Sequence, residues 1–512
     1  MEIVADGESL TIDRVVEVAR RGAAVRLELP ARFHASRELV ATKATGAEPV
    51  YGVNTGFGLL ANIPIPLDQV AELQRNLIMS HSAGVGDPVP TEVSRAMLLL
   101  RLNALAKGYS GVREELVRLL LDMLNRGVHP VIPSRGSVGA SGDLAPLAHL
   151  ALVVIGQGQA EFQGSIMAGD EALSRAGLSP LTLAAKEGLA LINGTQFMAA
   201  YGALALHDAD RLVEAAEIAC ALSIEAFKGS MRPSDPRLQA VRPHPGQIAS
   251  AAHLHTLLEG SQINESHQHD CPRVQDPYSL RCAPQVFGAV REGLGFARQI
   301  VERELNSATD NPLCFPESGD ILSGGNFHGQ PIALALDVAK MVITQLGNFS
   351  DRRSYRLLSA AFSGLSPFLA KNPGLNSGYM VAQYTAAALC AENSILGMPA
   401  TLHSIPTSAG MEDFNSLGAT SAVQLRAILE NARRIVAVEL LCGVQGIEEH
   451  RPLRTTPSLE AAVTGVREVA PSLERDRPLS DEIERVAEHI RTGRLTDSAA
   501  NCADSTIGLF TE

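Results

Sequence analysis

The chain has 512 residues, of which 46% are hydrophobic and 19% charged, a composition that can bury a large core and does not indicate disorder. Its 56 acidic residues outnumber 43 lysines and arginines, and the net charge of -13 argues against a nucleic-acid partner, which needs a basic face. The acidic start lacks a signal peptide's apolar segment, and no apolar run is long enough to span a bilayer. We therefore expect a cytoplasmic protein.

Helical periodicity dominates the chain. Apolar residues recur with helical spacing over residues 92–107 and 113–125, and the apolar run at 147–155 predicts a buried helix. Long Ala- and Leu-rich stretches follow at 198–227, 284–305, 330–361, 377–396 and 416–444. Strand patterns are short, at 26–29 and 161–166. We predict a mainly α fold in which long helices pack in a bundle.

Two segments interrupt the helical pattern. Residues 231–247 contain four prolines and are predicted to form a loop and a candidate boundary, and residues 261–277 are predicted to form a second, polar loop. Gly-rich turns are concentrated in the N-terminal part of the chain. We expect a smaller N-terminal domain over residues 1–206 and a long-helix bundle over 207–512.

The seven cysteines are scattered, their number is odd and none forms a CxxC pair, so we expect free thiols. One stretch, residues 267–271 (HQHDC), contains residue types that bind zinc. It has no partner CxxC or HxxxH motif, so we predict that the protein has no metal site.

The most informative segment is residues 136–149 (GSVGASGDLAPLAH). Its small residues let the backbone fold onto itself, and Gly142 has no Cβ to keep its amide nitrogen from the carbonyl of Ala140. Attack there closes a five-membered ring, and loss of water from that step and from Ser141 leaves an exocyclic methylidene, an electrophile. A Gly-rich turn before a helix, or a phosphate cradle, is the alternative, but the P-loop Lys-Ser/Thr is missing.

This segment resembles the signature of the aromatic amino-acid ammonia-lyases, whose cofactor is 4-methylidene-imidazol-5-one (MIO). Similar blocks occur in order along nearly the whole chain: 51–58 (YGVNTGFG), 188–196 (GLALINGTQ), 274–282 (VQDPYSLRC), 304–313 (ELNSATDNPL) and 324–331 (GGNFHGQP). The resemblance implies an L-aspartase-like helical fold, a cofactor formed by the chain itself from Ala140, Ser141 and Gly142, and a homotetramer with shared active sites.

The resemblance also implies roles for individual residues. Tyr51 and Tyr278 are the candidate catalytic bases or proton shuttles. Arg281 lies three residues after Tyr278, and its planar guanidinium suits the substrate carboxylate.

Other residues are expected beside the cofactor or the substrate. Asn193 hydrogen-bonds near the cofactor, and Phe327 packs beside its ring. Asp143 begins an apolar helical run, where a carboxylate suits the helix N-terminus. Gln275 and Asn311 are expected to be polar residues of the pocket.

Two positions bear on the substrate. Ser80-His81 matches the dipeptide of the histidine-specific members, and His81 can hydrogen-bond an imidazole; some tyrosine aminomutases share this pair. Glu412 matches the carboxylate that binds the substrate imidazole, although Gly410, Met411 and Phe414 replace the Asn, Gln and His usual around it.

We therefore expect elimination of ammonia from histidine to give urocanate, with no metal and no external cofactor. The alternatives are a tyrosine or phenylalanine ammonia-lyase, a 2,3-aminomutase, and a helical scaffold without catalysis.

Overall fold

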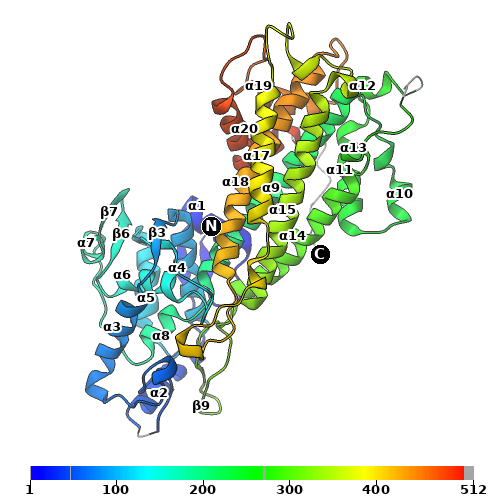
Figure 1. Cartoon of the computed structure of the whole chain (residues 1–512). Coiled ribbons are helices and arrows are strands. Elements are labelled where there is room, and N and C mark those ends of the chain that lie inside the picture. Colours follow the sequence, from blue (N-terminus) through cyan, green and yellow to red (C-terminus); the bar gives the residue numbers. More distant parts are fainter. Residues whose placement is uncertain (1, 47, 269–272, 501–512) are drawn as a thin grey trace. The chain divides into compact units, whose positions relative to one another are not determined.

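The computed structural model describes residues 2–46, 48–268 and 273–500, which divide into two compact units. Unit 1 contains Met1–His207, Ala297–Asp337 and Pro399–Gln424, and unit 2 contains Asp208–Phe296, Val338–Met398 and Leu425–Glu512. Unit 1 is therefore discontinuous in sequence. Four long helices contribute residues to both units: α9 (Gln196–Phe227), α14 (Ala283–Leu305), α15 (Gln330–Leu357) and α18 (Gly418–Glu448) (Figure 1).

Unit 1 combines short helices with small sheets. Its helices are α1 (Ile12–Arg21), α2 (Ala31–Ala44), α3 (Val70–His81), α4 (Thr91–Ala106), α5 (Glu114–Arg126), α6 (Leu144–Val154), α7 (Gly169–Arg175) and α8 (Glu187–Ile192). Its strands are β1 (Ile3–Ala5), β2 (Val25–Leu27), β3 (Val85–Pro88), β4 (His129–Pro130), β5 (Pro133–Arg135), β6 (Gln159–Phe162), β7 (Ser165–Ala168), β8 (Leu313–Phe315) and β9 (Asp320–Leu322). They pair as β1-β2, β3-β5, β4-β6-β7 and β8-β9, and only β1-β2 is parallel.

The core of unit 1 lies around α4 and α6. Helix α6 is buried on nearly all sides, as its almost uninterrupted apolar sequence predicts, and α4 is buried over residues 96–106 although this stretch includes Arg101 and Asn103. Helix α4 packs against α1 and α5, and α6 packs against α3 and α8. The loop at residues 136–143 leads directly into α6, so this core supports it.

Unit 2 is almost entirely helical. Besides its shares of the long helices it contains α10 (Pro236–Ala240), α11 (Pro245–Leu258), α12 (Gln262–Glu265), α13 (Tyr278–Arg281), α16 (Ala360–Ser363), α17 (Met380–Leu396), α19 (Pro457–Arg467), α20 (Ser480–Thr492) and α21 (Arg494–Ala500). The long helices lie side by side in this unit (Figure 1).

Buried polar contacts tie these helices together. The fully buried carboxylate of Glu439 on α18 accepts hydrogen bonds from Ser223 on α9 at 2.7 Å and from Ser350 and Arg353 on α15 at 2.6 and 2.5 Å. Breaking such a buried pair would be strongly destabilising, because it would leave an uncompensated charge in the core.

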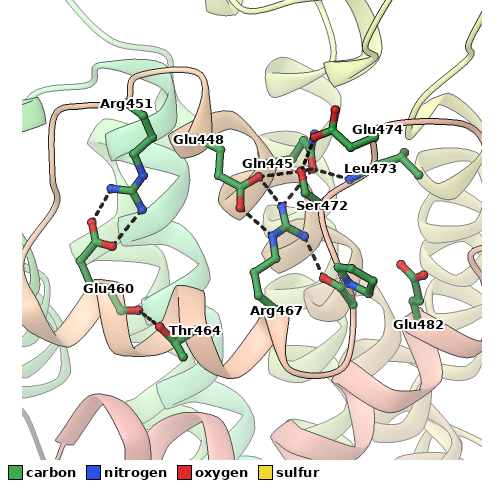
Figure 2. A network of polar contacts seen from close by, with 12 residues as sticks. Gln445, Glu448, Arg451, Glu460, Thr464, Arg467, Ser472, Leu473, Glu474 and Glu482 are labelled. Carbon is green, nitrogen blue, oxygen red and sulfur yellow. Dashed lines mark hydrogen bonds and ion pairs between the residues drawn. The ribbon is translucent and has the colours of Figure 1, made fainter.

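A second polar network joins the end of α18 to α19 (Figure 2). Arg467 donates to Glu448 at 2.7 Å and to Gln445 at 2.9 Å, and Arg451 pairs with Glu460 at 2.6 Å. Because each guanidinium meets its carboxylate through two nitrogens, the geometry of the chain's turn into α19 is well specified.

Among the described residues, only α15 is long and apolar enough to cross a membrane by length and composition. Just over half of the apolar window, 56%, is buried inside the protein. The helix also carries Arg353, whose charge is paired with Glu439 in the core. These are properties of a core helix.

The mainly α fold is confirmed, and the predicted helices match α4, α5, α9, α14, α15, α17 and α18 within a few residues.

The prediction of a loop over 231–247 is wrong, because this segment contains α10 and the start of α11, both inside unit 2. Pro236 and Pro245 occupy the first turn of these helices, where a missing N–H costs nothing. The strand predicted over 161–166 is a hairpin, with a turn between β6 and β7.

Candidate active site

The tripeptide of residues 140–142 lies in a compact loop. Ser141 has φ 51° and Gly142 φ 79°, both in the left-handed region. A Cβ on Gly142 would collide with the Gly194 carbonyl oxygen and would lie 3.0 Å from that of Phe327. Glycine is therefore required at 142, while Ser141 accepts a strain of about 1–3 kcal/mol, as residues at functional sites often do.

The turn between α8 and α9 holds this loop. Asn193 Nδ2 donates to the carbonyl oxygen of Ser141 at 3.0 Å, and the Asp143 N–H donates to that of Gly194 at 2.7 Å. Asn193 is 3% exposed, and its Oδ1 has no hydrogen-bond partner among the described residues. The structure thus brings Asn193 into direct contact with the tripeptide.

Asp143 acts on a different helix from the one predicted. It precedes α6, but its side chain makes no cap hydrogen bond to that helix. Instead Oδ2 accepts from the backbone N–H groups of Phe197 and Met198, in the first turn of α9, at 3.0 Å each. Full burial raises the pKa of Asp143 to about 7.

Phe327 and Asn311 come from the segment that follows α14. The backbone of Phe327 lies close to Gly142, because a Cβ on Gly142 would be 3.0 Å from the Phe327 carbonyl oxygen. The side chain of Phe327 is half-buried. Asn311 is buried, and its Oδ1 accepts from the N–H of Gly324 at 2.7 Å. This hydrogen bond holds Gly324, which lies shortly before Phe327 in the chain.

Glu412 lies at the tripeptide. Its Oε1 accepts from the Ser141 hydroxyl at 3.3 Å, and its Oε2 accepts from the hydroxyl of Thr407 at 2.8 Å. Thr407 and Glu412 also form an isolated antiparallel bridge. Thr407 was not predicted from the sequence, where a lone Thr five residues before a Glu has no distinguishing pattern.

The three unusual residues around Glu412 fit this loop. Gly410 has φ 89°, a conformation that glycine and asparagine adopt more readily than other residues. Met411 is 61% exposed, and the ring of Phe414 stacks on that of His328 with centroids 6.1 Å apart. His328 Nε2 also donates to the carbonyl oxygen of Phe414 at 3.0 Å. With these three residues beside it, Glu412 contacts both Ser141 and Thr407.

The charge of Glu412 acts on the pKa of both Tyr51 and His81. The Tyr51 hydroxyl accepts from the N–H of Gly58 at 3.3 Å, and burial raises the pKa of Tyr51 while the Glu412 charge raises it further. His81 ends α3, with its Nδ1 3.1 Å from the Ser80 hydroxyl. Burial lowers the pKa of His81, with Glu412 opposing, so the imidazole is neutral at pH 7.

Three further predicted residues belong to unit 2. The four residues of α13 bring the guanidinium of Arg281 over the ring of Tyr278, 4.6 Å from its centroid. Tyr278 is 69% exposed, and Gln275 is exposed. The segment is anchored by Asp276, which accepts from the N–H of Ser230 at 2.6 Å.

Among the described residues, no group of three His, Cys, Asp or Glu side chains could hold a metal ion. Three residues of the HQHDC stretch, 269–271, lie outside the described residues. The five cysteines that the structure describes are free thiols.

The helical fold and the site together define a helical-bundle lyase. Residues 10–468 match the family of aromatic amino acid lyases, and the chain belongs to this family. It is 53% identical to histidine ammonia-lyase of Stigmatella aurantiaca, over 96% of this chain and 97% of that protein.

Solved structures extend the comparison. Histidine ammonia-lyase from Trypanosoma cruzi superposes with a TM-score of 0.91 at 43% identity, covering 98% of this chain and 96% of that one. Tyrosine aminomutase from Streptomyces globisporus superposes with a TM-score of 0.93 at 40% identity, covering 99% and 100%. Overall shape therefore does not separate the two activities, and the substrate has to be argued from side chains.

Proposed function

We propose that this protein eliminates ammonia from L-histidine to give trans-urocanate. The observation that carries the proposal is the position of Glu412, whose carboxylate contacts Ser141 while its charge acts on His81. An imidazole offers an N–H to a carboxylate and a second nitrogen to a neutral histidine, whereas a phenyl ring offers neither. The identity to histidine ammonia-lyases supports the same substrate.

We also propose that Ala140, Ser141 and Gly142 form 4-methylidene-imidazol-5-one. The residues present fit this group: Gly142 has no room for a Cβ, Ser141 takes a left-handed conformation, and Asn193 holds the Ser141 carbonyl. When formed, the group supplies an electrophilic carbon that makes the substrate nitrogen a better leaving group. Asn193 and Asp143 hold the loop in place, and Phe327 lies beside it.

The chain's other side chains bind the substrate and move protons. Glu412 and His81 orient the imidazole, Arg281 binds the carboxylate, and Tyr51 or Tyr278 takes the β-proton. Burial raises the pKa of Tyr51 and so favours its protonated form, which means that substrate binding must lower this pKa if Tyr51 is the base. We assign Gln275 to the substrate pocket.

We propose a cytoplasmic homotetramer with shared active sites. Large apolar side chains on α17 support an interface there, since Val381, Tyr384 and Ile395 are 57%, 60% and 74% exposed in the single chain. Light scattering on the purified protein tests the tetramer directly.

The proposed function is tested by incubating the purified protein with histidine, tyrosine and phenylalanine and following the absorbance of each acrylate. We expect urocanate from histidine as the main product. Reaction of another amino acid without urocanate formation contradicts the substrate, and a β-amino acid product identifies an aminomutase.

The cofactor is tested by intact mass. The wild-type chain should be about two water molecules lighter than its sequence predicts, as self-dehydration requires. Ser141→Ala should remain folded, lose this difference and stop deamination. Ser165→Ala, at an exposed position in β7, is the matched control and should behave as wild type.

A further inference from the structure

Behind the turn that holds the tripeptide lies a fully buried arginine that was not singled out from the sequence. Arg101, on α4, is 0% exposed. Its Nη1 donates to the carbonyl oxygen of Asn193 at 2.8 Å and to Oε1 of Gln196 at 2.9 Å. Its Nε and Nη2 have no hydrogen-bond partner among the described residues.

Burying a cation costs free energy unless the cation is paired and hydrogen-bonded. Burial lowers the pKa of Arg101 to about 10, and the opposing charge of Asp310 only partly offsets this. Asp310 is itself engaged by Lys186 at 2.5 Å, so Arg101 does not have a carboxylate of its own. The hydrogen bonds that the structure gives to its guanidinium go to two carbonyl oxygens, those of Asn193 and of the Gln196 side chain.

Those two contacts bracket the turn between α8 and α9. Asn193 follows the last residue of α8, and Gln196 begins α9. Because arginine can only donate, it holds the oxygen of the Gln196 amide, whose Nε2 then donates to Thr309 at 2.9 Å. One guanidinium nitrogen therefore fixes both ends of the turn.

The turn is packed tightly against this group. A Cβ on Gly194 would lie 2.5 Å from Nη1 of Arg101 and 2.9 Å from the hydroxyl of Thr309. On its other face the same turn holds the tripeptide, through Asn193 Nδ2 to Ser141 and the Gly194 carbonyl to Asp143. A displacement of the turn is thus passed directly to the loop.

We propose that Arg101 is a positioning residue that sets the α8–α9 turn, and through Asn193 and Gly194 the tripeptide, in the geometry needed for its cyclisation. This inference rests on the proposed cofactor. Arg101 touches neither the tripeptide nor the substrate; it acts through the turn. Ring closure depends on orientation, and misplacement by about an ångström lowers the rate of such reactions strongly.

The test compares Arg101→Met, Arg101→Lys and Arg95→Met with wild type. Arg95 is the matched control: it is half-buried on the same helix, and it donates to the Val18 carbonyl through Nε at 3.1 Å and Nη2 at 2.7 Å, away from the turn. Each protein is purified by size exclusion so that only folded chains are measured. Intact mass then gives the fraction that has lost two waters.

Arg101→Met should reduce the dehydrated fraction of folded chains about tenfold, because two buried acceptors lose their donor. Arg101→Lys keeps a charge without the planar guanidinium, so its dehydrated fraction should lie between those of Arg101→Met and wild type. Arg95→Met should match wild type even if its melting temperature falls.

Complete dehydration of folded Arg101→Met overturns the proposal and leaves Arg101 a purely structural residue. If that variant yields no folded protein, Arg101→Lys decides: reduced dehydration supports the proposal and full dehydration overturns it. Failure of the cofactor proposal itself is recognised separately, because the wild-type mass would then show no loss of water.

Discussion

Thr407 donates a hydrogen bond of 2.8 Å from its hydroxyl to Oε2 of Glu412. A second hydrogen bond determines this direction: Asn415 Nδ2, which can only donate, contacts the Thr407 hydroxyl oxygen at 3.2 Å. The single proton of Thr407 is therefore directed to the carboxylate. Glu412 is held at one oxygen by a residue of its own loop while the other faces Ser141.

Thr407→Val should lower kcat/KM for histidine by about ten- to a hundredfold, since a hydrogen bond to a charged group contributes about 1.5–3 kcal/mol. Valine keeps the shape of threonine, so folding should be little changed. Thr407→Ser retains the hydroxyl and should stay close to wild type. Equal activity of the valine and serine variants would show that Thr407 does not position Glu412.

His81→Phe should shift substrate preference from histidine towards phenylalanine. The neutral imidazole of His81 can hydrogen-bond the imidazole of the substrate. In the variant the substrate imidazole loses this partner, which costs about 1–3 kcal/mol of binding free energy. We expect kcat/KM for histidine to fall about tenfold or more, measured beside that for phenylalanine. His34→Phe, with a side chain 60% exposed, is the control. An unchanged ratio of the two constants would remove His81 from the pocket.

Glu225 should make the protein less stable as pH rises. It is fully buried on α9, Ser261 donates to it, and burial raises its pKa from 4.5 to about 7. The folded state keeps the proton to higher pH than the unfolded chain, so the free energy of unfolding falls from pH 4.5 through 7. The loss at pH 8 amounts to about 3 kcal/mol from this group.

Glu225→Gln removes that titration. In urea denaturation the variant should match wild type near pH 4 and become more stable than it at pH 8. Glu265→Gln, at an exposed site on α12, should leave the pH dependence unchanged. Parallel curves for wild type and Glu225→Gln across this range would contradict the assignment.

Lys186 and Asp310 form a fully buried ion pair at 2.5 Å in unit 1. Lys186→Met should lower the apparent free energy of unfolding by about 3–5 kcal/mol, because it removes the cation paired directly with the buried Asp310 carboxylate. Arg175→Met breaks the exposed Arg175–Glu171 pair on α7 and should cost well under about 1 kcal/mol. Lys186→Met combined with Asp310→Asn should recover part of the loss; no recovery would show that the two charges are not coupled.

The sequence predicted most of the helical architecture, because burial of an apolar face repeats every three to four residues and can be counted along the chain. Helix α4, expected at 92–107 and found at Thr91–Ala106, is an example. The pattern failed at 231–247, where Pro236 and Pro245 start helices rather than exclude them. Proline has the same local conformation in a loop and in a first helical turn, so the residues after it decide between the two.

Within the candidate site, the tripeptide and the glycines around it could be identified from the sequence, since a run of small residues permits the close backbone approach that the loop requires. Asn193 and Glu412, which contact this loop, were named through the family resemblance, but the other residues that hold it could not be. Arg101, Thr407 and the α9 end that Asp143 contacts lie far apart along the chain or in unremarkable segments. Their roles depend on contacts between distant residues, which hydrogen-bond direction and close packing select only once the chain has folded.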